Sequence, residues 1–264
     1  MTAGRPEGQR VVYGVNPVRE LLGDGAARVE ELWLADGLRA ATVAEFARLA
    51  AERRTRLRRA PRGRLDQLAG GDGHQGVVAV VAGAFGYLGV EEILAAAEAS
   101  GAPPLLVLLD GVEDPQHLGA IARSAVALGA HGLVIPRDRA AGVTPAAIKA
   151  SAGVIGRCRV ARVTNLSRTI EELKERGVWS VALAADGDRD LAALDLRGPT
   201  ALVLGGEGDG VRPLVRRTCD HACRIPMAAG VESLSVSAAG AVALYEAARQ
   251  RGGGGGETVV DLRP

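Results

Sequence analysis

Three segments of the 264-residue sequence combine residue types that could do chemistry at one site. They are DGVEDPQHLGAIARSA (residues 110–125), LGGEGDGVRPL (204–214) and IPMAAGVESLSVSAAG (225–240). Histidine and glutamate are common proton donors and acceptors, and glycines let a ligand approach the backbone closely. The pattern therefore indicates either solvated turns with helix caps or a small-molecule site.

Two familiar kinds of site do not match these residues. The glycines of the second segment do not follow G-x-G-x-x-G, and no Gly-Lys-Ser/Thr forms a P-loop, so a nicotinamide oxidoreductase lacks its fingerprint. Cys219, His221 and Cys223 offer three ligands with no second cluster to complete a zinc site. We therefore expect no metal.

Each of the three segments lies at the end of a run that reads as a strand. Continuous apolar strands separated by helices predict a parallel sheet covered on both faces, whose ligands lie at the carboxyl ends of the strands. The predicted strands are at residues 105–110, 131–136, 158–164, 178–185, 201–208 and 224–230, and the predicted helices at 119–129, 144–156, 167–177, 211–220 and 235–251.

A smaller α/β unit precedes this region. Strands at 11–13, 29–35 and 77–82, a helix with Pro17 in its first turn and a helix at 41–54 predict a domain over 1–82. We expect a linker over 83–104 holding one helix, the main domain over 105–251, and a glycine-rich tail over 252–264. Residues 1–9 and the tail are expected to be disordered.

The bulk composition bounds the class of protein. With 47% hydrophobic and 24% charged residues the chain is globular, and its apolar runs are too short to span a bilayer. No apolar secretion signal opens the sequence, and three cysteines without framework spacing suit a reducing cytoplasm. Cytoplasmic localisation is therefore expected.

Nucleic-acid binding would need a local basic patch, because the net charge is only +1. The run RRTRLRRAPRGR, Arg53 to Arg64, holds seven arginines and no acid. It is either a solvated loop or a surface for phosphates, which match the planar guanidinium. The candidate RNA-binding residues in it are Arg53, Arg54, Arg56, Arg58 and Arg59.

Three individual residues in these segments each allow two interpretations. Arg123, on a helix of small and apolar residues, either reaches solvent or points into the cleft at the strand ends. Glu207 suits a turn as well as a catalytic role, and His117 suits a solvated helix start as well as an active site.

Taken together, the three segments resemble the three motifs of the SpoU family of RNA ribose 2′-O-methyltransferases. PRDRAAGVTPAAIKASAG and VTNLSRTIEELKERGVW resemble the branch that modifies a guanosine of 23S rRNA. YGVNPVRELL and GDGHQGVVAVV resemble that branch's small L30e-like RNA-binding domain. The resemblance runs from about Tyr13 to Arg251.

The resemblance implies a SPOUT-type α/β domain with a deep trefoil knot, S-adenosylmethionine as cofactor and a homodimer with the site near the interface. By motif position, Arg123 would help deprotonate the ribose 2′-hydroxyl and Glu207 would organise the site. An arginine is a weak base, so Arg123 needs an anionic partner or acts electrostatically. The cofactor-binding residues implied are Leu204, Gly205, Gly206, Ile225, Met227 and Leu234.

Two positions depart from the family pattern. His117 and Ser235 stand where the family usually has asparagine, and both are expected to be catalytic positions. A neutral histidine keeps one donor and one acceptor and could serve as a base, whereas serine is shorter. Three functions follow: 2′-O-methylation of a ribose in 23S rRNA, RNA binding with altered or lost transfer activity, or transfer to a different acceptor.

Overall fold

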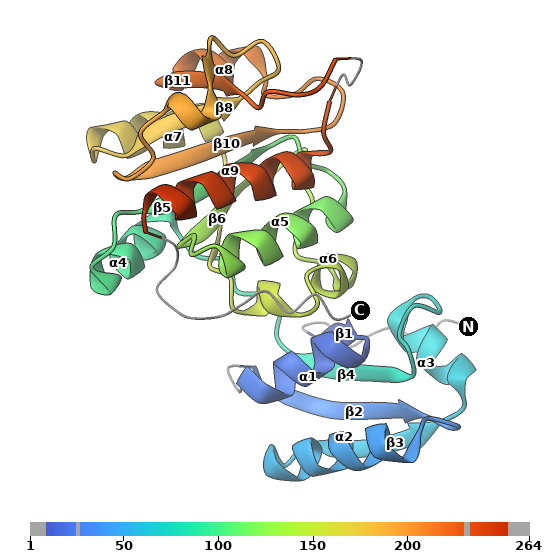
Figure 1. Ribbon diagram of the computed structural model, residues 1–264. Coiled ribbons are helices and arrows are strands. Elements are labelled where there is room, and N and C mark those ends of the chain that lie inside the picture. The colour runs from blue at the N-terminus through green and yellow to red at the C-terminus, as the bar shows by residue number, and fades with distance from the viewer. Residues whose placement is uncertain (1–8, 25–26, 230–232, 253–264) are drawn as a thin grey trace.

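The computed structural model describes residues 9–24, 27–229 and 233–252, which form a small and a large α/β unit (Figure 1). The small unit spans 9–82 and the large unit 105–252, with α4 (Val90–Ser100) between them in sequence. Across these residues, no helix has the length and apolarity that crossing a membrane would require.

The small unit is a four-stranded sheet in the order β1-β4-β2-β3. Strand β4 pairs antiparallel with β1 and β2, and β3 pairs parallel with β2 at the edge. Its strands are β1 (Gln9–Tyr13), β2 (Val29–Ala35), β3 (Arg56–Ala60) and β4 (Val77–Ala82), and its helices are α1 (Val15–Asp24), α2 (Ala40–Glu52) and α3 (Arg62–Ala69).

The large unit contains a seven-stranded sheet in the order β7-β6-β5-β10-β8-β11-β9, and every neighbouring pair is parallel. This confirms the predicted parallel α/β architecture. The strands are β5 (Leu105–Asp110), β6 (Gly132–Pro136), β7 (Val160–Val163), β8 (Trp179–Leu183), β9 (Arg189–Asp190), β10 (Thr200–Gly205) and β11 (His221–Arg224).

Helices cover both faces of this sheet, so the apolar strands are buried on both sides. In β5, Leu105, Val107 and Leu109 belong to one core, while Leu106 and Leu108 belong to the other. Helices α5 (Pro115–Ala127), α6 (Pro145–Ala150) and α9 (Val236–Gln250) pack on the first core, with the short turns η1 (Val154–Gly156) and η2 (Leu191–Ala193). Helices α4, α7 (Leu166–Glu175) and α8 (Pro213–Thr218) pack on the second.

The two units meet where α6 lies against β1 and α1. Lys149 of α6 places its ammonium 5.9 Å from the ring centroid of Tyr13 in β1. Helix α4 belongs with the large unit by its packing, because Ile93 is fully buried in the second core.

Three predictions from the sequence are wrong in detail. The strand predicted at 224–230 lies at His221–Arg224, because Pro226 cannot donate a ladder hydrogen bond and the chain turns away at Ile225. No strand or helix was predicted over residues 55–64 of the basic run, which form β3 and the start of α3. Gln9, expected to be disordered, begins β1.

Other predictions fall on residues that the structure does not describe. Residues 1–8 and 253–264 lie outside the described residues, and so do residues 230–232 between β11 and α9. The expected knot depends on the path of that connection, so its threading stays a prediction.

His131, just before β6, contacts the start of β5 and is expected to make stability depend on pH. His131 accepts a hydrogen bond at Nδ1 from Leu105 N (3.0 Å). Burial, and then the nearby charges of Arg251 and Arg159, lower the pKa of His131 below the ordinary 6.5. The unfolded chain then binds more protons than the folded one. The protein therefore loses stability as the pH falls below the pKa of His131 in the unfolded chain.

We expect the free energy of unfolding to fall with a slope of at most about 1.4 kcal/mol per pH unit for this one group. Urea titrations of the wild type and of His131→Asn between about pH 7 and 5 measure it. Asparagine keeps a short acceptor without titrating, so its curve should be flatter. Equal slopes in the two proteins would contradict this role of His131.

Candidate active site

The three polar segments converge at the carboxyl ends of neighbouring strands. Asp110 ends β5 and Gly205 ends β10, and these two residues are paired in the sheet. The third segment leads into α9, which packs on α5 and β10. The structure thus brings together residues about a hundred positions apart, at the place expected for a parallel sheet.

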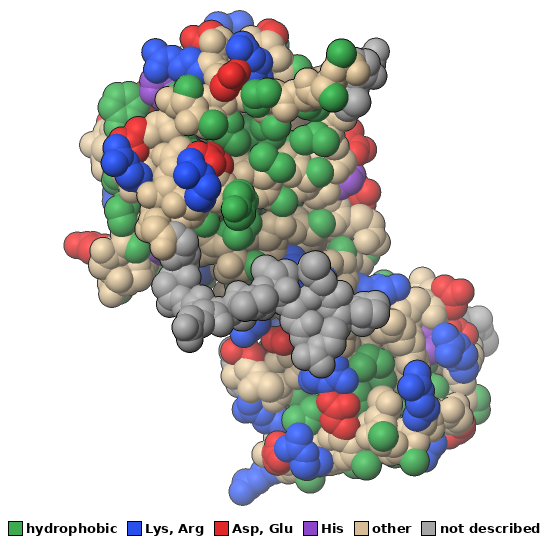
Figure 2. Space-filling view, viewed as in Figure 1, with side chains coloured by type: hydrophobic (Ala, Val, Ile, Leu, Met, Phe, Trp, Pro, Cys, Tyr) green, Lys and Arg blue, Asp and Glu red, His purple; other side chains and the backbone are tan. Residues whose placement is uncertain are grey.

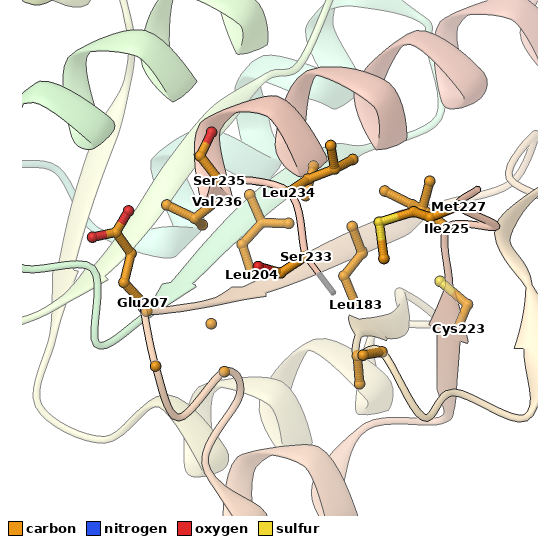
Figure 3. Close-up of a pocket in the computed structure, with 17 residues that line it drawn as sticks. Leu183, Leu204, Glu207, Cys223, Ile225, Met227, Ser233, Leu234, Ser235 and Val236 are labelled. Atoms are coloured by element: carbon orange, nitrogen blue, oxygen red, sulfur yellow. The ribbon is translucent and has the colours of Figure 1, made fainter. Parts of the chain in front are cut away.

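A first cavity of about 630 Å³ opens beside the end of β10 (Figure 3). Figure 3 shows Glu207 at one end, Ile225 and Met227 at the other, and Leu204 and Ser233 between them. All six residues expected to hold the cofactor line it: Leu204, Gly205, Gly206, Ile225, Met227 and Leu234. Its size and its largely apolar wall suit a small organic ligand.

Two glycines in the wall have no room for a side chain. A Cβ atom on Gly205 would lie 1.9 Å from the carbonyl carbon of Gly210, and one on Gly206 would lie 2.1 Å from the carbonyl oxygen of Gly111. Both contacts are with backbone, which cannot move aside cheaply. The loop therefore folds back tightly and presents bare backbone to the cavity.

A second cavity of about 510 Å³ adjoins the first. The two share Gly206, Glu207, Gly210 and Val236 as a common wall. The second is more polar, and it is further lined by Asp110, Gly111, Val112, Glu113, Asp114, His117, Arg139, Asp209 and Arg212. Two ligands, one bound in each cavity, would face each other beside Glu207 and Val236.

His117 reaches this wall from the first turn of α5. Asp114 caps the helix by accepting from Gln116 N (2.7 Å), and Pro115 occupies the first helical position. The imidazole Nε2 lies 2.7 Å from Oε1 of Glu207, and Nδ1 lies 3.3 Å from Oγ of Ser237. The His117 side chain is 20% exposed and that of Glu207 is 62% exposed, so solvent reaches the pair.

The carboxylate of Glu207 favours a proton on Nε2 of His117 and leaves the lone pair on Nδ1. Nδ1 therefore faces a hydroxyl group as an acceptor. The order carboxylate, imidazole, hydroxyl is the one by which side chains activate an oxygen nucleophile. The arrangement can take a proton from an alcohol.

Ser235 and Ser237 lie together at the start of α9. Ser235 is its N-cap and accepts from Ala238 N (3.3 Å), and its hydroxyl lies 3.3 Å from that of Ser237. Ser237 was not among the residues predicted from the sequence. The signal available was its place two residues after Ser235, which puts both hydroxyls at one helix end.

A buried ion pair fixes the floor of the second cavity and was also missed. The carboxylate of Asp110 is fully buried and accepts from Arg212 N (2.8 Å) and Nε (2.7 Å). Gly206 N donates to the backbone carbonyl of Asp110 (2.8 Å). Because breaking a buried pair is costly, this contact locks the glycine loop onto β5.

Arg123 lies apart from the other candidate residues. It lines neither of the two cavities, and its side chain is exposed. It follows His117 by six residues, which places it about 9 Å farther along α5 and on a different face. Within one chain, therefore, Arg123 is not part of this cluster.

The five candidate RNA-binding arginines have different surroundings. Arg53 caps α1 by donating to the carbonyls of Leu22 and Gly23. Arg59 lies 3.7 Å from Asp36. Arg56 and Arg58 both lie near Glu31, and Arg54 lies before β3 with a positive φ of 53°.

The three cysteines are poor nucleophiles in the folded protein. Burial raises the pKa of the thiols of Cys158, Cys219 and Cys223 to about 12. Among the residues that the structure describes, no three His, Cys, Asp or Glu side chains gather as metal ligands.

We therefore expect the folded protein to react with Ellman's reagent at pH 8 much more slowly than a free thiol, because the thiolate is the reacting form. In denaturant all three thiols should react at once. A thiol that reacts rapidly in the native protein would contradict the burial described here.

The comparisons with known proteins agree with this geometry. The model of the SpoU rRNA Methylase family matches residues 104–245, and a model named RNA 2′-O ribose methyltransferase substrate binding matches residues 11–85. The 23S rRNA (guanosine-2′-O-)-methyltransferase RlmB of Pseudomonas syringae is 43% identical over 91% of this chain and 95% of its own. RlmB of Pseudomonas aeruginosa is 44% identical over 91% and 96%.

A solved structure covers both units. The SpoU methyltransferase AviRb from Streptomyces viridochromogenes, in complex with AdoMet, superposes with a TM-score of 0.75 and 29% identity over 95% of each chain. The family match covers more than half of the chain, and the relatives align along nearly its whole length. The chain therefore belongs to the SpoU rRNA methylase family, with an N-terminal substrate-binding domain and a mostly parallel α/β methyltransferase domain.

Proposed function

We propose that the protein transfers the methyl group of S-adenosylmethionine to the 2′-hydroxyl of a ribose in 23S rRNA, at a guanosine. The observation that carries the proposal is the pair of adjoining cavities with Glu207 and His117 at their junction. Relatives named for this reaction align over most of the chain.

The first cavity fits the cofactor. The tight backbone at Gly205 and Gly206 presents amide and carbonyl groups, and Leu204, Ile225 and Leu234 offer apolar surface for a flat ring. When bound, S-adenosylmethionine supplies an electrophilic methyl group. The protein's part is to hold the ribose oxygen in line with it, which lowers the barrier by positioning.

His117 is the base of the reaction in this proposal. Glu207 holds the proton on Nε2, so Nδ1 accepts the proton of the ribose hydroxyl, directly or through Ser237. Ser235 caps α9 and keeps Ser237 in place. The alternative of an RNA-binding relative without transfer is favoured by no observation, because His117 and Ser235 both make polar contacts within the site.

Arg123 acts in a homodimer in this proposal. It projects from α5, whose neighbour α9 exposes Val242 (41%) and Tyr245 (60%). Figure 2 shows hydrophobic side chains spread over this part of the large unit. A second copy seated on α5 and α9 would cover this surface and bring Arg123 toward the partner's site.

Mixed dimers test the placement of Arg123. Arg123→Ala and His117→Ala are each expected to lose most activity. Co-expressed with different affinity tags and purified through both, they should form heterodimers with about half the wild-type activity, because one of the two sites is then intact. Heterodimers as inactive as the parents would contradict action across an interface.

The remaining assignments follow from the reaction. We propose the division into an RNA-binding domain (1–82), a linker (83–104), the methyltransferase domain (105–251) and a glycine-rich tail (252–264). We propose that the protein acts in the cytoplasm, on its rRNA substrate. Of the arginine run, the residues on β3 suit RNA best, since Arg53 caps α1.

Transfer of labelled methyl from S-adenosylmethionine to unmodified 23S rRNA tests the proposed function, with Arg123→Ala and His117→Ala as controls. Label in the rRNA with the wild type, and at least about 100-fold less with the variants, is expected. Cofactor binding by calorimetry without any label in the rRNA would overturn it.

A further inference from the structure

One face of the small sheet combines aromatic and basic side chains in register. Tyr13 (β1) and Trp33 (β2) both pair with Val78 of β4, and Trp33 pairs with Arg58 of β3, so these side chains share a row across all four strands. Glu31 and Arg56 form the next row on the same face. We call this surface, with Arg64 of α3, the Trp33 face.

Two guanidinium groups lie close to the indole ring of Trp33. The guanidinium carbon of Arg58 lies 5.2 Å from the indole centroid and that of Arg64 lies 5.8 Å from it. Glu31 fixes two of these groups, because its carboxylate accepts from Trp33 Nε1 (2.9 Å) and from Arg58 Nε (2.9 Å). The indole and one guanidinium are thus preorganised, and the ring remains partly exposed.

Arg64 is held less firmly. It donates to the amide oxygen of Gln67 (3.2 Å), and within the described residues it forms no ion pair with a carboxylate. A planar ligand can therefore replace it over the indole without breaking an ion pair. The freed guanidinium would still be available to a phosphate.

The positive charge continues toward the large unit. Lys149 of α6 lies over Tyr13 at the other end of the row. Figure 1 shows β1 nearest the large unit and β3 at the far edge, and α3 on the same side of the view as the start of α9. Val78, in the middle of the row, is fully buried with Leu65 of α3, so RNA would reach the row at its Trp33 end, beside Arg58 and Arg64.

From this arrangement we infer that the Trp33 face binds an unpaired nucleotide of the RNA substrate, with its base stacked on Trp33 and its phosphates held by Arg56, Arg58 and Arg64. Bases in loops stack on aromatic rings and on guanidinium planes, whereas paired bases cannot. The inference rests on the proposed RNA substrate and adds that recognition requires a single-stranded loop.

Fluorescence offers a direct test, because the chain contains two tryptophans. In Trp179→Phe the sole indole is Trp33, and Trp179 is itself 57% exposed and stacks on His221, so phenylalanine keeps that contact. Titration with a hairpin of 23S rRNA carrying an open loop should quench Trp33. The matched variant Trp33→Phe, which keeps Trp179, should show no change.

Affinity gives the second readout. We expect Trp33→Leu to weaken hairpin binding about ten-fold, the lower range of the effect of one stacked base, and Trp33→Phe to weaken it less. Binding of a fully paired duplex of equal length should be unaffected. An unquenched Trp33 together with unchanged hairpin affinity of Trp33→Leu would overturn the inference.

These results separate the inference from the proposed function. Calorimetry with S-adenosylmethionine should give the same affinity for Trp33→Leu and the wild type, because Trp33 lies outside the cofactor cavity. If the hairpin quenches Trp33 but no methyl is transferred to any RNA, the RNA surface stands and the reaction is wrong. If methyl is transferred at equal rates by Trp33→Leu and wild type at limiting RNA, the surface is wrong.

Discussion

His117→Ala is expected to lower kcat for methyl transfer about 100-fold or more, with little change in the affinity for S-adenosylmethionine. General base catalysis contributes factors of this size. The affinity should survive because His117 lines the second cavity and not the first. Single-turnover transfer rates and calorimetry measure the two quantities separately.

His117→Asn distinguishes a base from a residue that only shapes the site. We expect kcat in His117→Asn to be reduced about as far as in His117→Ala. Asparagine restores the amide expected from the family pattern and keeps a polar group near the Nδ1 position, yet it cannot act as a base. A His117→Asn variant as fast as the wild type would contradict the role of His117 as base.

Glu207→Gln provides the matched control for the other half of the pair. Glutamine keeps the shape but removes the charge 2.7 Å from Nε2, so the proton on that nitrogen is no longer favoured. We expect a smaller loss than for His117→Ala, because a base without its carboxylate partner still functions in part.

Gly205→Ala is expected to abolish cofactor binding, with an affinity at least about 100-fold weaker. The new Cβ would lie within 2.3 Å of three backbone atoms of Gly210 and Val211, so the loop after β10 must open. Opening it moves Glu207 and the shared wall of the two cavities. Calorimetry with S-adenosylmethionine measures the effect.

Gly156→Ala is the matched control, because nothing lies within 4 Å of its Cβ position. It should bind the cofactor like the wild type. Thermal unfolding of both variants shows whether Gly205→Ala remains folded. Normal cofactor affinity in a folded Gly205→Ala would contradict the assignment of the first cavity.

The sequence predicted most of the large unit because its strands are continuous apolar runs between helices with clear caps. β5 and β10 were found in this way, and their polar ends located the site. The strand at His221–Arg224 was displaced in the prediction because its own residues are half polar, whereas the neighbouring Ile225 and Met227 are apolar but line a cavity. Apolar composition alone does not distinguish a core from a ligand wall.

The edge strand β3 was missed for a related reason. RLRRA has arginines where a central strand would have apolar residues, and among the described residues β2 is its single partner strand. The pattern of its side chains can be interpreted only once Trp33 is known to lie opposite Arg58 in the neighbouring strand. Pairing between strands far apart in sequence is not encoded in either segment alone.

Part of the site could be predicted from the sequence. Motif order placed His117, Glu207 and Ser235 at one edge of the sheet, and the structure joins them through Ser237. His117 and Glu207 are 90 positions apart in the sequence, and no local signal predicted their 2.7 Å contact. The position of Arg123 could not be predicted, because it depends on which face of α5 turns away from the cleft.

Identification of the methylated nucleoside tests the central claim most directly. 23S rRNA treated with the protein and S-adenosylmethionine would be digested to nucleosides and analysed by mass spectrometry, and the modified position mapped by ribose-methylation sequencing. The account predicts 2′-O-methylguanosine at one position, absent with His117→Ala. A methyl group on a base, or no methylated nucleoside despite measurable cofactor binding, would contradict it.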